Sequence, residues 1–189
     1  MKKEFIITTY SENHIGLTNR ITIIFTRRQV NIESLTGSES ALPGIYKITI
    51  VVNEEEEKIK NIVKQIDKLV DVLKAFYHTN EEMIYQEIAL YKVSTKSLME
   101  SDEIEKLIRN HNARILEITP EYTVIEKTGH KEETQELFTE LNKYGVLQFI
   151  RSGRIAITRS RIEKLSEFLK ERDEILLKVE SRGKLRPTI

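Results

Sequence analysis

The chain contains no cysteine, and only seven glycines and three prolines occur among its 189 residues. The lack of cysteine excludes disulfides, thiolate catalysis and Cys-ligated zinc or iron–sulfur clusters. Neither sign of charge is in excess, because 30 basic side chains balance 30 acidic ones. Without a net positive field, nucleic acid and anionic membranes are poor candidates for a binding partner.

Long apolar runs are also missing. The apolar start at residues 5–7 is followed by two threonines and is too short for the core of a signal peptide. No run approaches the ~20 residues that a membrane-spanning helix needs. We therefore expect a soluble, cytoplasmic protein.

Apolar periodicity predicts four strands and two helices in the first half of the chain. The strands are expected at 5–10, 31–39, 45–52 and 69–77, and the helices at 17–28 and 54–66. Pro43 and Gly44 supply a hairpin turn. Asn53 is predicted to cap the second helix, with the acidic residues 54–57 in its first turn. This order is that of the split βαβ unit, in which two helices cover one face of a four-stranded antiparallel sheet.

The same order of elements repeats in the second half. Strands are expected at 83–94, 113–119, 122–127 and 146–158, and helices at 102–109 and 131–143. Gly145 is predicted to end the last of these helices. The predicted fold class is therefore α+β, with two tandem ferredoxin-like βαββαβ domains at 1–79 and 80–159. The charged residues 160–189 are expected to form a helical extension.

Recognisable catalytic motifs do not occur in the sequence. The P-loop, dinucleotide-binding, zincin and nucleophile-elbow patterns are all absent. Four histidines lie near the ends of predicted elements without metal-ligand spacing, and we predict that they are structural surface residues: His14, His78, His111 and His130. Carboxylates alternate with lysine and arginine, as on solvated helix faces. We therefore predict no catalytic residue and no metal ligand.

The connection from the first strand to the first helix has a composition suited to an anion. Asn13, His14, Ile15 and Gly16 lead directly into the helix that begins at Leu17. Unpaired backbone N–H groups at a helix start, together with the helix dipole, favour a carboxylate. An ordinary loop, with Asn13 as cap and Gly16 in a left-handed turn, explains the same residues. This segment alone does not decide between the two interpretations.

Several stretches resemble the acetolactate (acetohydroxyacid) synthase small subunit. The segments 12–21, 25–28 and 31–36 are similar to its N-terminal ACT domain, and Asn31 to Leu35 is the most specific of them. The similarity continues in the second half at 87–93, 113–120 and 151–156. It covers about residues 4–159, and implies an ACT domain at 1–79 followed by the C-terminal ferredoxin-like domain of the small subunit at 80–159.

The resemblance implies a regulatory subunit without chemistry of its own. In the family, the large catalytic subunit carries thiamine diphosphate, magnesium and FAD and forms 2-acetolactate in branched-chain amino acid biosynthesis. The small subunit activates it and confers feedback inhibition by a branched-chain amino acid, usually valine. The effector lies at the interface of a homodimer formed through ACT domains. Carried onto this chain, the effector-binding residues are Asn13, His14, Ile15, Gly16, Leu17, Asn31 and Ile32.

Three other functions remain open at this point. A tandem ACT sensor that regulates a different enzyme shares the first-half motifs, although the second-half segments around Thr119-Pro120 and 151–153 argue against it. A transcriptional regulator lacks a recognisable helix-turn-helix or basic stripe here. A free-standing enzyme lacks a recognisable site.

Overall fold

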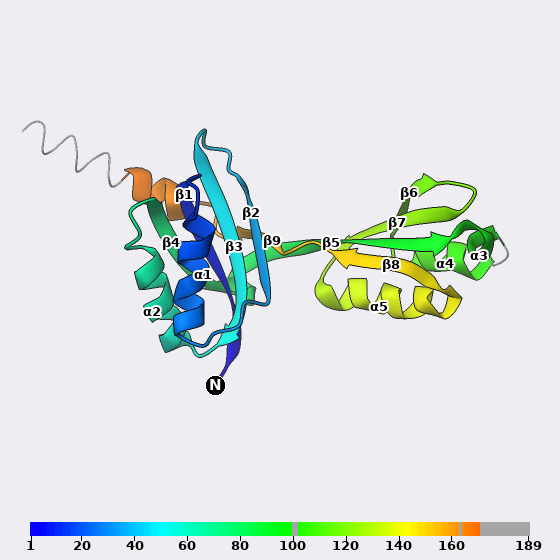
Figure 1. The fold of residues 1–189 in the computed structure, drawn as a ribbon, viewed down its shortest axis with the longest axis horizontal. Coiled ribbons are helices and arrows are strands. Elements are labelled where there is room, and N and C mark those ends of the chain that lie inside the picture. The colour runs from blue at the N-terminus through cyan, green and yellow to red at the C-terminus, as the bar shows by residue number, and fades with distance from the viewer. Residues whose placement is uncertain (100–101, 163, 171–189) are drawn as a thin grey trace, which may run out of the picture.

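Figure 1 shows the computed structural model, in which two α+β units lie along the long axis. The chain runs from the first unit to the second along one long strand and returns after the last strand of the second sheet. The structure describes residues 1–99, 102–162 and 164–170. Within these ranges, no helix is long and apolar enough to cross a membrane.

The first unit is a four-stranded antiparallel sheet with two helices on one face. Its strands are β1 (Lys3–Glu12), β2 (Ser34–Glu39), β3 (Ile45–Glu54) and β4 (Val72–Thr79), in the order β2-β3-β1-β4. Its helices are α1 (Leu17–Arg27) and α2 (Glu56–Ile66). Strand residues alternate between faces, so Phe5 and Ile7 pack in the helix-side core while Ile6 lies on the opposite face.

The start of α2 differs from the prediction. Strand β3 continues to Glu54, and α2 begins at Glu56 with Glu55 as its N-cap residue. The predicted cap at Asn53 is wrong, because Asn53 and Glu54 are still paired with β1. The Glu54 carboxylate instead accepts a hydrogen bond from Lys58, at 3.0 Å.

The second unit repeats this topology. Its strands are β5 (Met83–Ser94), β6 (Arg114–Ile118), β7 (Tyr122–Gly129) and β8 (Val146–Arg151), in the order β6-β7-β5-β8. Helices α4 (Asp102–Asn110) and α5 (Lys131–Leu141) accompany the sheet, together with three short helices: η1 (Asn80–Glu82), α3 (Thr95–Met99) and η2 (Asn142–Tyr144). Gly145 ends the α5 region in a left-handed conformation, as predicted, with φ +83°. The predicted fold of two ferredoxin-like units is confirmed.

The last predicted strand, at 146–158, is wrong as a single element. Strand β8 ends at Arg151, and the chain leaves the second sheet before forming β9 (Ile155–Thr158). Strand β9 pairs with the first residues of β5, 83–86. The resulting β5–β9 ribbon lies on the face of the first sheet opposite α1 and α2, where Met83 and Ala156 pack against Ile6 and Val51 (Figure 1).

The connection between β8 and β9 passes close to the first sheet. Gly153 lies so close to β2 that a Cβ atom on it would be 2.0 Å from Thr36 Oγ1. Only a residue without a side chain fits there. After β9, residues 164–170 are helical and Leu165 is buried. The greater part of the predicted extension, 171–189, lies outside the described residues.

Candidate functional site

The helix start singled out in the sequence lies at an exposed corner of the first unit. Gly16 is the N-cap residue of α1, with φ +81°, and it makes no side-chain cap hydrogen bond. The first turn of α1 contains no acidic residue. The left-handed conformation of Gly16 confirms one part of the ordinary-loop interpretation. Its other part, the cap at Asn13, is wrong, because Gly16 occupies the cap position. The Leu17 N–H donates to the His14 carbonyl at 3.2 Å, and the first turn of α1 has no side-chain cap for its other N–H groups, an arrangement that favours a bound anion.

The carboxylate of Asp71, the residue just before β4, fixes the β1–α1 loop. Nδ1 of His14 lies 2.9 Å from Oδ1 of Asp71, and Arg20 from α1 contacts the other oxygen of the same carboxylate. Hydrogen bonds from His14 and then Arg20 hold the pKa of Asp71 below its ordinary value. The backbone N–H of Glu12 also donates to the Asp71 carbonyl, at 3.0 Å. The loop is therefore held at its base while its tip points outward.

An open cleft lies beside this loop. It has a volume of about 490 Å³ and is bordered by Asn13 and His14 on one side and by the β2–β3 turn at Pro43 and Gly44 on the other. Ile15 is fully exposed, whereas Leu17 is buried in the core. Five of the predicted effector residues, 13–17, are therefore contiguous at one corner of the sheet.

The other two predicted effector residues lie at the opposite end of the same sheet. Asn31 is exposed and Ile32 half-buried, and both come just before β2, whose first residue pairs with Val51. The β1–α1 loop instead follows the end of β1, opposite Ile45. Six residue steps separate Ile45 from Val51, which corresponds to about 20 Å of extended strand. One copy of the chain does not bring the two halves of the predicted site together.

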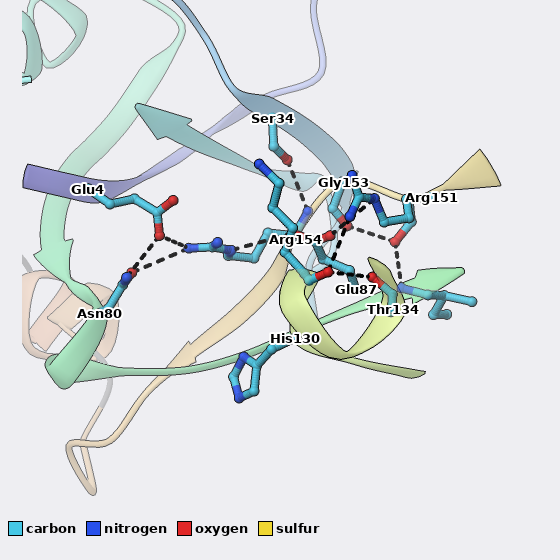
Figure 2. Close-up of polar contacts among 12 residues, drawn as sticks. Glu4, Ser34, Asn80, Glu87, His130, Thr134, Arg151, Gly153 and Arg154 are labelled. Atoms are coloured by element: carbon cyan, nitrogen blue, oxygen red, sulfur yellow. Dashed lines mark hydrogen bonds and ion pairs between the residues drawn. The ribbon is translucent and has the colours of Figure 1, made fainter. Parts of the chain in front are cut away.

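A buried arginine joins the two units, and sequence reasoning did not single it out. Arg154, just before β9, is only 4% exposed. Its Nη1 donates to Glu4 Oε1 of β1 at 2.7 Å and to Asn80 Oδ1 of η1 at 3.3 Å (Figure 2). Its guanidinium also lies 4.0 Å from the centre of the Tyr85 ring. The segment 151–156 was part of the family resemblance, but its residue types alone do not indicate this burial.

The same residue contacts the edge strand of the first sheet. The backbone N–H of Arg154 donates to Ser34 Oγ in β2 at 3.0 Å, and its Nε lies 3.9 Å from Glu87 Oε1 of β5. Burial raises the pKa of Glu4, but hydrogen bonds from Arg154 and Asn80 outweigh that effect and leave the pKa below the usual 4.5. Glu4 is therefore ionised at neutral pH, and the junction includes a charge-assisted hydrogen bond.

The histidines do not behave uniformly. The side chain of His14 is 55% exposed, whereas His78 is 3% exposed, so the prediction of a surface residue is wrong for His78. His78 is buried because its side chain faces β9 and the residues that follow it. Within the described ranges, no three His, Asp or Glu side chains are placed to hold a metal ion.

The two sheets and their helices define a tandem ferredoxin-like α+β protein. Each unit matches a known protein family. Residues 7–74 match the family described as AHAS small subunit-like ACT domain, and residues 86–160 match the small subunit of acetolactate synthase. The acetolactate synthase small subunit of Bacillus subtilis (strain 168) is 34% identical over 162 residues, 85% of this chain and 94% of the relative.

Two further comparisons agree. The probable acetolactate synthase small subunit of Methanothermobacter thermautotrophicus is 31% identical over 154 residues, 82% of this chain and 92% of that protein. The crystal structure of the small subunit from Thermotoga maritima superposes with a TM-score of 0.76 at 28% identity, covering 85% of this chain and 99% of that chain. The chain belongs to the acetolactate synthase small subunit family, as the resemblance predicted.

Proposed function

We propose that this chain is the regulatory subunit that binds the catalytic large subunit of acetolactate synthase, activates it and confers feedback inhibition by a branched-chain amino acid. Valine is the first candidate effector. Effector binding is inferred mainly from the start of α1. Gly16 provides no side-chain cap for the N–H groups there, and an open cleft lies beside the loop. Family membership supports the partnership with a large subunit.

The effector's α-carboxylate binds at the start of α1. The Leu17 N–H already donates to the His14 carbonyl at 3.2 Å, so the following N–H groups of the first turn, those of Thr18 and Asn19, donate to the carboxylate. The helix dipole adds to the attraction. Asn13 adds a side-chain amide at the same cleft. The ammonium group and the side chain then need partners elsewhere, which are Asn31 and Ile32.

A second copy of the chain completes this site. Asn31 lies about 20 Å of strand away from the loop of its own copy. Strand β2 is at the edge of the first sheet, so two β2 strands can pair antiparallel about a two-fold axis. Such pairing aligns the start of one β2 with the end of the other. The Asn31 and Ile32 of one copy then face the loop of its partner.

Inhibition follows from a difference in effector affinity between two states of the complex. An effector shifts an equilibrium only towards the state that it binds more tightly. The effector-free subunit activates the catalytic partner, and the bound amino acid stabilises a less active arrangement. Thiamine diphosphate, magnesium and FAD belong to that partner, where 2-acetolactate is formed. This chain contributes binding and no catalytic group.

Reconstitution with a candidate large subunit tests the proposal. We expect the chain to raise the rate of acetolactate formation from pyruvate, and valine to reverse that rise and increase the melting temperature of the isolated chain. Leucine and isoleucine are the matched comparisons for effector choice. Turnover of pyruvate by the isolated chain, or co-purification with an enzyme that does not use thiamine diphosphate, would contradict the assignment. Valine that changes neither melting temperature nor rate would contradict the inhibition.

A further inference from the structure

A second cavity lies on the other face of the first sheet, away from α1 and α2. Its volume is about 240 Å³, and it is enclosed between β1, β3 and β4 on one side and β9 with the following residues on the other. It shares no lining residue with the cleft at the β1–α1 loop. The proposed effector site does not use this cavity.

Two buried polar side chains line the cavity. His78 of β4 and Thr8 of β1 are each 3% exposed. Neither ring nitrogen of His78, nor the hydroxyl oxygen of Thr8, has a hydrogen-bond partner in the part of the chain that the structure describes. A buried polar group without a partner destabilises the fold, because it has lost its hydrogen bonds to water. A ligand that hydrogen-bonds both side chains would recover that loss.

Positive charge surrounds the same space. Lys47 of β3 borders the cavity, with its Nζ donating to the Ala156 carbonyl at 3.0 Å. Arg161 and Lys164, in the segment after β9, also border it. Among the described residues that line the cavity, none is a carboxylate. Three cationic side chains around a partly enclosed space favour an anion and disfavour a cation.

Much of the remaining lining is apolar, which indicates that the ligand has an apolar part as well as an anionic group. The apolar and aromatic side chains are Tyr10, Phe76, Met83, Ile157 and Leu165. The volume is below the roughly 300–1,000 Å³ of pockets for drug-sized molecules. An inorganic anion would leave these apolar walls without a partner. A short hydrocarbon chain attached to an anionic group uses both parts of the lining.

We propose that this cavity binds a short-chain carboxylic acid that has no amino group. The carboxylate accepts hydrogen bonds from His78 and Thr8 within the field of the three cations, and the hydrocarbon chain lies against the apolar walls. An α-amino acid fits less well, because its ammonium group meets repulsion and no lining carboxylate. The cavity therefore prefers carboxylic acids without an ammonium group. The proposed effector site, in contrast, binds an acid that carries one.

Binding to this cavity has an expected pH dependence. Burial lowers the pKa of His78, the charges of Lys164 and Lys47 lower it further, and the Glu82 charge opposes them. Arg161 is the remaining charged group on the cavity wall. His78 is therefore neutral at pH 7, and a bound carboxylate favours its protonation. Binding should therefore raise the pKa of His78, and affinity should be higher at acidic pH and fall as pH rises.

Calorimetry on the full chain, with isovalerate as the probe, tests the proposal. We expect saturable binding of isovalerate, and weaker binding of both L-valine and inorganic phosphate at this cavity. Thr8→Val and Lys164→Gln should each weaken isovalerate about tenfold, because each removes a partner of the carboxylate. Lys164 is exposed, so its variant keeps the test valid if the Thr8 variant does not fold.

Thr9→Val is the matched control. Thr9 is also buried with an unpartnered hydroxyl among the described residues, but its strand partners Ile48 and Ala75 belong to the helix-side core. It should leave isovalerate binding unchanged, as should Asn31→Ala, which tests the effector site separately. The proposal is overturned if isovalerate does not bind, if Thr9→Val weakens it as much as Thr8→Val, or if L-valine competes equally in the Asn31 variant.

Discussion

Glycines at three positions show how one residue type answers different physical demands. Gly16 is the N-cap residue of α1 and Gly145 follows η2, and both adopt a left-handed φ of just over +80°. At both positions the space that a Cβ atom would occupy is open, with no neighbouring atom within 4 Å. Gly153 is needed instead because β2 approaches it closely. The first two demands are local and were visible in the sequence, whereas the third arises only when residues more than a hundred positions apart meet.

Gly16→Ala should separate inhibition from activation. The cost to stability is about 1 kcal/mol, since the left-handed backbone is strained for alanine while no neighbouring atom clashes. A shifted loop should weaken valine binding and relieve inhibition, with activation retained. Gly145→Ala is the matched control, because it has the same strain in the second unit. Equal inhibition curves for both variants and the wild type, measured in the reconstituted complex, would refute the site.

At the scale of elements, periodicity predicted most strands and helices, and the errors have tertiary causes. Asn53 resembles a helix cap, but pairing with β1 keeps it in β3. Periodicity does not predict helix α3, because five residues are too few to show a helical pattern. A tertiary contact holds its start, where the Thr95 hydroxyl donates to the Thr119 carbonyl at 2.7 Å. Strand β9 was merged with β8, since nothing local indicates that it pairs with the start of β5.

The second prediction concerns pairing between two copies of the chain at the edge of β2. The Ser40 N–H donates to the Ile45 carbonyl at 2.8 Å, so in this register Ser38 also bonds towards β3 and Glu39 directs its N–H outward. Glu39→Pro should therefore weaken pairing between copies while costing less than about 1 kcal/mol of stability, because edge strands tolerate proline. Sedimentation equilibrium should show a larger dimer dissociation constant and calorimetry a weaker valine response.

Ser38→Pro is the control for the Glu39 variant. It removes a hydrogen bond within the first sheet, so it should lower the melting temperature more than Glu39→Pro does. If the Glu39 variant dimerised and bound valine like the wild type, pairing through β2 would be wrong. The effector site would then have to form without a second β2 edge.

At the scale of the whole molecule, the tandem arrangement was predictable and the placement of the two units was not. Each unit has its own core, and each follows the order of elements read from periodicity. Their junction depends on pairs such as Glu4 with Arg154, 150 residues apart, which no local pattern records. Five of the seven predicted effector residues, 13–17, lie at one corner of the first sheet, and Asn31 and Ile32 lie at its opposite end. The interface between two copies that the resemblance implies stays a prediction.

Replacing Arg154 tests whether the two units are coupled through their junction. Arg154→Met keeps much of the side-chain volume but leaves the Glu4 carboxylate without its cation and removes the contact with the Tyr85 ring. Breaking a buried ion pair costs about 3–5 kcal/mol, and the lower end applies because the Glu4 side chain is one-third exposed (33%). We expect a lower melting temperature and, in scanning calorimetry, two separate transitions in place of one.

Arg109→Met is the matched control, since the Arg109 side chain is 77% exposed and pairs with Glu105 on the surface of α4. An exposed pair of this kind contributes roughly 0.3–0.5 kcal/mol. If Arg154→Met behaved like Arg109→Met, the Arg154 side chain would not couple the two units. If instead the transitions separate, the Arg154 side chain couples the units through Glu4, while its backbone N–H, which the substitution retains, still donates to Ser34 of β2. A change at the effector interface then has a physical route to the rest of the chain, and the Arg154 variant should activate the large subunit while responding less to valine.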